Sequence, residues 1–166
     1  MSPFDPTLAA RATEFVAACT RAQLTLAVAE SCTGGLLAGL ITAVPGSSAV
    51  LQLGVVAYAD AAKSGVLQVP KSALGHGAVS AQVALAMAEA VLRLGRAELA
   101  AAITGIAGPG GGSEAKPVGL VYIAAVRRGR PANAQRFLFG ERGRSQVRAA
   151  SVSAALSMLE ALLQAS

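Results

Sequence analysis

Short apolar runs alternate with segments of helical period along the chain, and this alternation limits the fold more than any other feature. Thr25 to Ala29, Gly54 to Ala59 and Leu99 to Thr104 have the length and composition of buried strands. Helical patterns start near Asp5, Thr33, Asp60, Ser80 and Ser145. Strands separated by helices favour parallel pairing, because each helix carries the chain back across a face of the sheet.

Two further strands predict a local departure from parallel pairing. Val118 to Val126 and Gln135 to Phe139 have strand character, and the polar segment between them contains Gly129 and Pro131. A short connection of this kind favours a hairpin-like pair. We therefore expect an α/β fold, a three-layer α/β/α sandwich on a mixed, mostly parallel sheet of about five strands.

Composition narrows the class of protein. The 166 residues suit one domain covering 1–166, and 54% hydrophobic with 14% charged residues describes a globular chain. The net charge of +5 is dispersed, which favours acidic small ligands over nucleic acid. No apolar run is long enough to span a membrane and no signal pattern begins the chain, so we expect a cytoplasmic protein. Cys19, Cys32 and His76 predict neither a disulfide nor a metal site.

The run AESCTGG, residues 29–35, lies where a predicted strand meets a predicted helix. It combines a carboxylate, a hydroxyl and a thiol with backbone N–H groups that are free to bind an anion or an acyl oxygen. The alternative is structural, because Ser31 or Thr33 is also a typical helix N-cap. This segment alone does not decide between the two.

The run YADAAK, residues 58–63, follows the second predicted strand and ends in Lys63. A lysine acts as a general base only where burial or nearby positive charge lowers its pKa. The alternative is an exposed surface lysine.

The run TGIAGPGGGS, residues 104–113, follows the third predicted strand. Its glycines permit positive φ and close approach of the backbone to a ligand, so the loop is a candidate anion cradle. The alternative is a flexible loop without a ligand. Gly110, Gly112 and Ala115 fit the letters of a dinucleotide fingerprint, but a strand follows where that fingerprint requires a helix, so we expect no such cofactor.

Taken together, these segments resemble the CinA C-terminal domain family, whose stand-alone members are the nicotinamide-nucleotide amidohydrolases. Five motifs carry the resemblance: AESCTGG, PGSS (45–48), YADAAK, GHGAVS (75–80) and TGIAGPGGGSEAKPVG (104–119). The resemblance implies a three-layer sandwich and homo-oligomers. It also implies hydrolysis of the carboxamide of nicotinamide mononucleotide, a small nucleotide substrate, to nicotinate mononucleotide and ammonia, without a cofactor.

The same resemblance assigns roles to individual residues. It makes Ser31 the nucleophile, Lys63 the base, Tyr58 a group that orients the lysine or relays a proton, and Thr104 a group that binds the amide or steadies the lysine. Where relatives commonly have Ser-Asn, this chain has Ala59-Asp60. The residues assigned to substrate binding are Glu30, Cys32, Thr33, Gly34, Gly35, Ser48, Gly105, Gly108, Gly110, Gly111 and Arg142.

Three alternatives to this mechanism stay open at this point. The Cys32 thiol is a competing nucleophile, since a helix N-terminus lowers thiol pKa. The domain could bind a nucleotide without turning it over, or hydrolyse a different small amide. The substrate phosphate could lie in the 105–112 loop or against Arg142.

Overall fold

A computed structural model describes residues 4–164 of the chain. The elements are α1 (Pro6–Ala22), β1 (Leu26–Glu30), α2 (Leu36–Thr42), the 3-10 helix η1 (Ser47–Ala49), β2 (Leu51–Val56), α3 (Asp60–Gly65), α4 (Lys71–Leu74), α5 (Ala81–Leu94), β3 (Leu99–Gly105), β4 (Leu120–Arg127), β5 (Asn133–Leu138) and α6 (Arg144–Gln164).

The strands form one five-stranded sheet in the order β2-β1-β3-β4-β5. β1 pairs in parallel with both β2 and β3, whereas β4 is antiparallel to both β3 and β5. Four strands therefore run in one direction and β4 alone is reversed. This confirms the mixed, mostly parallel sheet and the hairpin-like pair predicted from the sequence.

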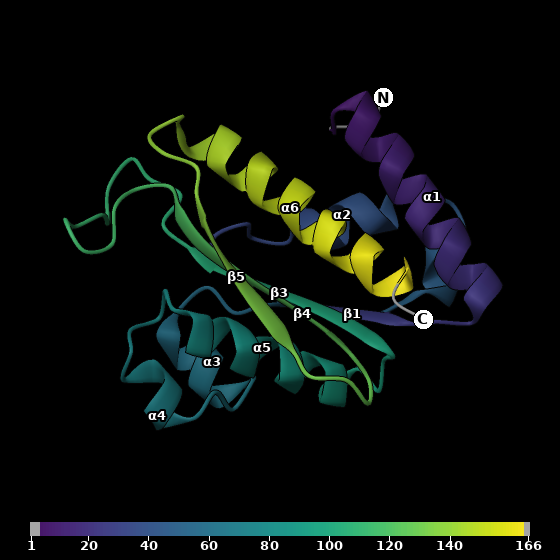
Figure 1. The fold of residues 1–166 in the computed structure, drawn as a ribbon, viewed down its shortest axis with the longest axis horizontal. Coiled ribbons are helices and arrows are strands. Elements are labelled where there is room, and N and C mark those ends of the chain that lie inside the picture. Colours follow the sequence, from purple (N-terminus) through teal and green to yellow (C-terminus); the bar gives the residue numbers. More distant parts are fainter. Residues whose placement is uncertain (1–3, 165–166) are drawn as a thin grey trace.

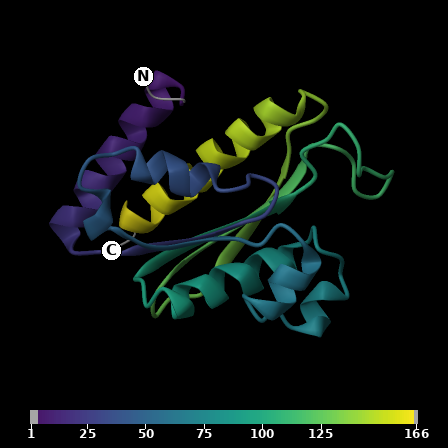
Figure 2. The same ribbon diagram turned by 180° about the vertical axis from the view of Figure 1, so that it is seen from behind.

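Helices cover both faces of the sheet and make three layers. Figure 1 shows α1, α2 and α6 on one face and α3, α4 and α5 on the other, and the view from behind in Figure 2 agrees. Each face buries its own apolar cluster. No helix within residues 4–164 is long and apolar enough to cross a membrane.

The two faces of the sheet are packed by side chains of different size. In β3, Leu99 and Ile103 point toward the cluster under α6, while Ala100 and Ala102 point toward the cluster under α5. Successive residues of a strand face opposite sides of the sheet, so the larger side chains lie on the α6 side and the alanines on the α5 side. The alanine face lets α5 lie close to the sheet, and a Cβ added at Gly95 would come within 2.8 Å of the Ala27 Cβ.

Several predicted boundaries were wrong by a few residues. The helix expected from Thr33 begins at Leu36, because Gly34 and Gly35 adopt φ of +59° and +93°, outside the helical region. The second strand is Leu51–Val56 rather than 54–59, since its backbone pairs with β1 from Leu51 onward.

The topology brings three strand ends to one place. β2, β1 and β3 are neighbours and parallel, so the segments that follow them leave the sheet at the same edge. Such an edge is where α/β sheets bind ligands. The three motifs that begin at residues 29, 58 and 104 all start there.

Candidate active site

A pocket of about 280 Å³ opens at this edge of the sheet. Ser31, Lys63 and Thr104 all line it, one from each of the three motifs. All three side chains belong to buried residues, with exposures of 7%, 2% and 1%. Parallel pairing thus brings the hydroxyl groups of Ser31 and Thr104, which lie 73 positions apart in the sequence, into one polar cavity with the amino group of Lys63.

Ser31 lies in a tight turn that the sheet holds at its base. Its N–H donates to the carbonyl of Ile103 at 2.9 Å, and its carbonyl accepts from the N–H of Gly34 at 3.0 Å. Among the described residues, the N–H groups of Cys32 and Thr33 have no acceptor in another residue. Of these two residues only Cys32 lines the pocket, so its N–H group is available to a ligand oxygen beside Ser31.

Glu30 was expected to bind substrate, and the structure gives it another role. The residue is 1% exposed, and its two carboxylate oxygens accept from the N–H groups of Leu37 at 3.0 Å and Ala38 at 2.9 Å. The first N–H groups of a helix lack partners within it, and Gly35 at the N-cap has no side chain to supply one. Glu30 therefore caps α2 and fixes the turn that carries Ser31.

The other residues of this turn shape it without lining the pocket. Gly34 and Gly35 supply the two left-handed backbone positions. Thr33 is fully buried and its hydroxyl has no partner among the described residues, while its carbonyl accepts from Arg148 Nη2 at 2.9 Å. Neither these glycines nor Thr33 reaches the cavity.

Cys32 lines the pocket but is poorly suited to act as the nucleophile. Burial raises the pKa of its thiol to about 11, and its own backbone N–H and the charge of Arg144 offset only part of that rise. The thiol is therefore protonated near neutral pH, contrary to the lowering expected from a helix N-terminus.

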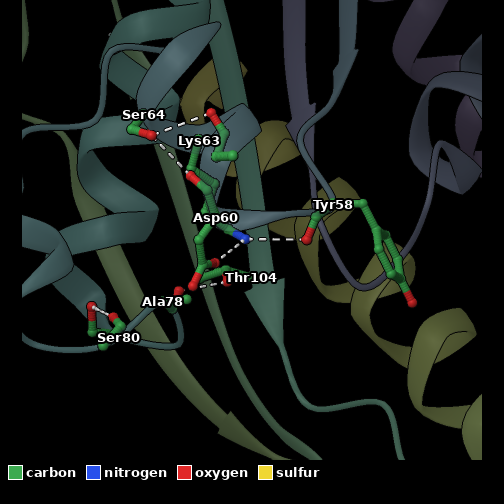
Figure 3. Close-up of polar contacts among 9 residues, drawn as sticks. Tyr58, Asp60, Lys63, Ser64, Ala78, Ser80 and Thr104 are labelled. Atoms are coloured by element: carbon green, nitrogen blue, oxygen red, sulfur yellow. Dashed lines mark hydrogen bonds and ion pairs between the residues drawn. The ribbon is translucent and has the colours of Figure 1, made fainter.

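Lys63 extends from α3 into the pocket and is nearly fully buried. Its Nζ donates to Oδ1 of Asp60 at 3.1 Å and to the carbonyl of Tyr58 at 3.4 Å (Figure 3). An ammonium group has three N–H donors, so one remains for a group inside the pocket. Asp60 was not among the residues expected to be functional, although its position three residues before Lys63 on a helix was a usable signal.

The Tyr58 side chain does not reach Lys63 as expected. Figure 3 shows the ring directed away from the lysine, and the residue is 57% exposed. Its hydroxyl instead accepts from Arg144 Nη2 at 2.6 Å. Tyr58 contacts Lys63 only through its backbone carbonyl, because its side chain points toward the start of α6.

Arg144, rather than Arg142, is the arginine in the pocket. It is the first residue of α6 and also donates from Nη1 to the carbonyl of Gly108 at 3.1 Å. Arg142 is exposed in the preceding turn. Ser48 lies in η1, before β2, and therefore at the opposite edge of the sheet from the strand ends.

The glycine-rich loop forms one wall of the pocket. Gly105, Gly108, Gly110 and Gly111 all line it. Gly108 has a φ of +80°, and a Cβ there would lie 2.6 Å from Cγ1 of Val118. A side chain is therefore excluded at Gly108, and the bare backbone of the four glycines lines the cavity beside Ile106 and Ala107.

The opposite wall contains Ala78 and Val79. Thr104 at the end of β3 donates its hydroxyl proton to the carbonyl of Ala78 at 2.8 Å (Figure 3). Within residues 4–164 no group of three or more His, Cys, Asp or Glu side chains is placed to hold a metal ion. The pocket presents hydroxyl, thiol, carboxylate, amino and guanidinium groups, together with the backbone N–H of Cys32.

Fold and pocket together define a three-layer α/β sandwich protein with a polar small-ligand site at the carboxyl ends of its parallel strands. The CinA C-terminal domain matches residues 8–163, and the chain belongs to that family.

Two relatives show the extent of the likeness. A CinA-like protein of Anaeromyxobacter sp. (strain Fw109-5) is 51% identical over 140 residues, which are 84% of this chain and 34% of the relative. A CinA-like protein of Syntrophus aciditrophicus is 50% identical over 147 residues, 88% of this chain and 35% of the relative. The chain thus spans about a third of the length of the curated relatives it matches.

Solved structures share the fold over nearly the whole chain. The competence/damage inducible protein CihA from Agrobacterium tumefaciens has a TM-score of 0.95 at 45% identity, covering 98% of this chain and 99% of that one. A CinA superfamily protein from Klebsiella pneumoniae has a TM-score of 0.89 at 36% identity, covering 95% and 98%.

Proposed function

We propose that this domain hydrolyses the carboxamide of nicotinamide mononucleotide to nicotinate mononucleotide and ammonia. One observation carries the proposal: a serine at a strand-end turn, a buried lysine and a buried threonine line the same pocket, beside the backbone N–H of Cys32, which has no acceptor in another described residue. Amide hydrolysis without a metal needs an activated nucleophile and a site for the developing oxyanion. Membership of the family, in which this activity is known, supports the substrate.

The proposed reaction proceeds in two stages. Lys63, in its neutral amine form, accepts the hydroxyl proton of Ser31 as the Ser31 Oγ attacks the carboxamide carbon, and the N–H group of Cys32 stabilises the negative oxygen. Collapse of the tetrahedral intermediate breaks the C–N bond, and the proton returns from Lys63 to the departing ammonia. Water then hydrolyses the Ser31 ester by the same route and releases the carboxylic acid.

The phosphate of the nucleotide is proposed to bind between the glycine-rich loop and Arg144. Two donors of Arg144 are held by Tyr58 and Gly108, and a guanidinium carries five, so three remain for an anion. The loop backbone and this charge face the same cavity. This replaces Arg142 in the sequence-based hypothesis.

A binding function without turnover is the second candidate, and one observation favours it. Lys63 Nζ is held by Asp60 and the Tyr58 carbonyl, and no hydrogen bond joins it to Ser31 among the described residues. In this alternative, the lysine is a fixed charge that attracts an anionic ligand.

Incubation of the purified protein with nicotinamide mononucleotide distinguishes these functions. We expect ammonia and nicotinate mononucleotide in equal amounts from the wild type and from Ser64→Ala, an exposed serine of α3. Ser31→Ala and Lys63→Ala are expected to release none. A wild type that releases no ammonia, yet melts at a higher temperature with the nucleotide present, would support the binding function.

The domain is also proposed to form homo-oligomers, as the resemblance to its family implies. Val56 and Val66 support this, since both are large apolar residues that are more than half exposed. Light scattering coupled to size-exclusion chromatography should give a mass that is a multiple of 16.5 kDa.

A further inference from the structure

The segment of residues 75–80, here called the pocket wall, is held by an unusually complete set of hydrogen bonds. Lys116 Nζ donates to the carbonyls of His76 and Val79, both at 2.8 Å. Ser80 Oγ donates to the carbonyl of Gly77 at 2.9 Å, and Thr104 Oγ1 donates to that of Ala78 at 2.8 Å. Each carbonyl from residue 76 to residue 79 therefore has a side-chain donor.

These bonds give the wall a fixed shape. Gly77 has a φ of +87°, and a Cβ there would lie 2.5 Å from Lys116 Nζ, so the lysine fits against a bare backbone. Ser80 also accepts from the N–H of Val83 as the N-cap residue of α5. The carbonyls before and after Ala78 are both bonded to side-chain donors, and these bonds hold the Ala78 carbonyl in place.

The fixed carbonyl determines the direction of the Thr104 hydrogen bond. A carbonyl oxygen only accepts, so the hydroxyl proton of Thr104 points to Ala78. A hydroxyl has one proton and two lone pairs, which leaves Thr104 only acceptor capacity toward the cavity. The residue is 1% exposed although it lines the pocket, so little solvent reaches its hydroxyl group.

We infer that Thr104 is the residue by which the pocket distinguishes a carboxamide from a carboxylate. Its lone pairs accept a hydrogen bond from the amide NH₂ group, whereas the acid product presents only oxygen lone pairs at the same place. A site built to pair with one polar group rejects the analogue that lacks it, because a buried partner is left unsatisfied. The inference rests on the proposed function, and it assigns product release to the loss of this hydrogen bond.

The same geometry excludes Thr104 as the donor of the leaving-group proton. Its only proton is bonded to the Ala78 carbonyl, so the proton for ammonia comes from another group. Lys116 lies outside the pocket and acts as a positioning residue, since it holds the wall that holds the carbonyl.

Equilibrium binding tests the inference separately from turnover. Calorimetry on protein carrying Ser31→Ala would measure the Kd of nicotinamide mononucleotide and of nicotinate mononucleotide, with ammonia assayed in the same samples. The ratio of the acid Kd to the amide Kd is expected to fall roughly tenfold in Thr104→Val, the effect of one hydrogen bond to a buried acceptor. Thr104→Ser should keep the parental ratio, and Lys116→Met should lower it in part.

An unchanged ratio in Thr104→Val, or an equal loss of both affinities, would overturn the inference. A ratio that falls as far in Thr104→Ser would also overturn it, since that variant retains the hydroxyl. If neither nucleotide binds at millimolar concentration, the ligand assignment fails and the inference fails with it. If the wild type binds the amide more tightly but releases no ammonia, only the proposed turnover fails. Melting temperatures of each variant separate loss of folding from loss of selectivity.

Discussion

The cap that Glu30 places on α2 predicts a large loss of stability in Glu30→Gln. Both oxygens of the buried carboxylate accept a backbone N–H, at 3.0 and 2.9 Å. Glutamine keeps one acceptor and turns an NH₂ group toward the other N–H, so one charge-assisted bond is lost and two donors face each other. A bond to a buried charge contributes roughly 1.5 to 3 kcal/mol, and an unsatisfied group adds to the loss, so we expect about 3 kcal/mol in all.

Thermal unfolding measures this effect directly. For a domain of this size 1 kcal/mol corresponds to about 2 to 4 °C, so the melting temperature should fall by about 6 to 12 °C. Glu98→Gln is the matched control, because Glu98 forms a half-exposed ion pair with Arg128 and should change the melting temperature by less than about 3 °C. A Glu30→Gln variant as stable as Glu98→Gln would refute the capping role.

Three further changes test the pocket. Cys32→Ala should keep the rate of ammonia release within about threefold of the wild type. Iodoacetamide should leave the wild type active at pH 7.5, and it should modify the Cys32 thiol faster as the pH rises toward the thiol pKa of about 11. Loss of activity on treatment at pH 7.5 would support Cys32 as the nucleophile. Asp60→Ala, which removes the carboxylate that holds Lys63 Nζ at 3.1 Å, should lower kcat by roughly tenfold. An unchanged kcat would show that this contact does not position the base. Arg144→Lys should raise the KM for nicotinamide mononucleotide by roughly tenfold, because lysine lacks the paired donors of a guanidinium group. Arg142→Lys should leave this KM unchanged. The reverse result would support Arg142, the arginine expected from the sequence, as the phosphate-binding residue.

The sequence predicted the features that depend on strand direction, whereas the order of the strands came from the structure. Ser31, Lys63 and Thr104 each follow or end a predicted strand. Residues at the carboxyl ends of neighbouring parallel strands lie at the same edge of the sheet. Their meeting in one pocket needed no knowledge of distances. The fold class followed from the same alternation of strands and helices.

The sequence could not predict contacts that depend on how distant segments pack. Glu30 stands at a strand end, where a carboxylate can face a ligand or cap a helix, and only the position of α2 decides. Tyr58 and Arg144 lie 86 residues apart, and neither helical nor strand period relates them. Arg142 and Arg144 differ by two residues, so the exact start of α6 determines which one enters the pocket.

The Lys116 contacts with the pocket wall have a consequence for how the site forms and opens. Lys116 lies 40 and 37 residues from the two carbonyls that it binds, so the wall acquires its donors only when the segment after β3 has folded against it. Opening of that segment would release two wall carbonyls together. Backbone amides of the pocket wall that exchange slowly with solvent hydrogen should therefore exchange faster whenever the segment after β3 opens. A ligand that binds this segment should slow exchange in the segment and in the pocket wall. The pocket is in this sense one cooperative unit built from two stretches of chain.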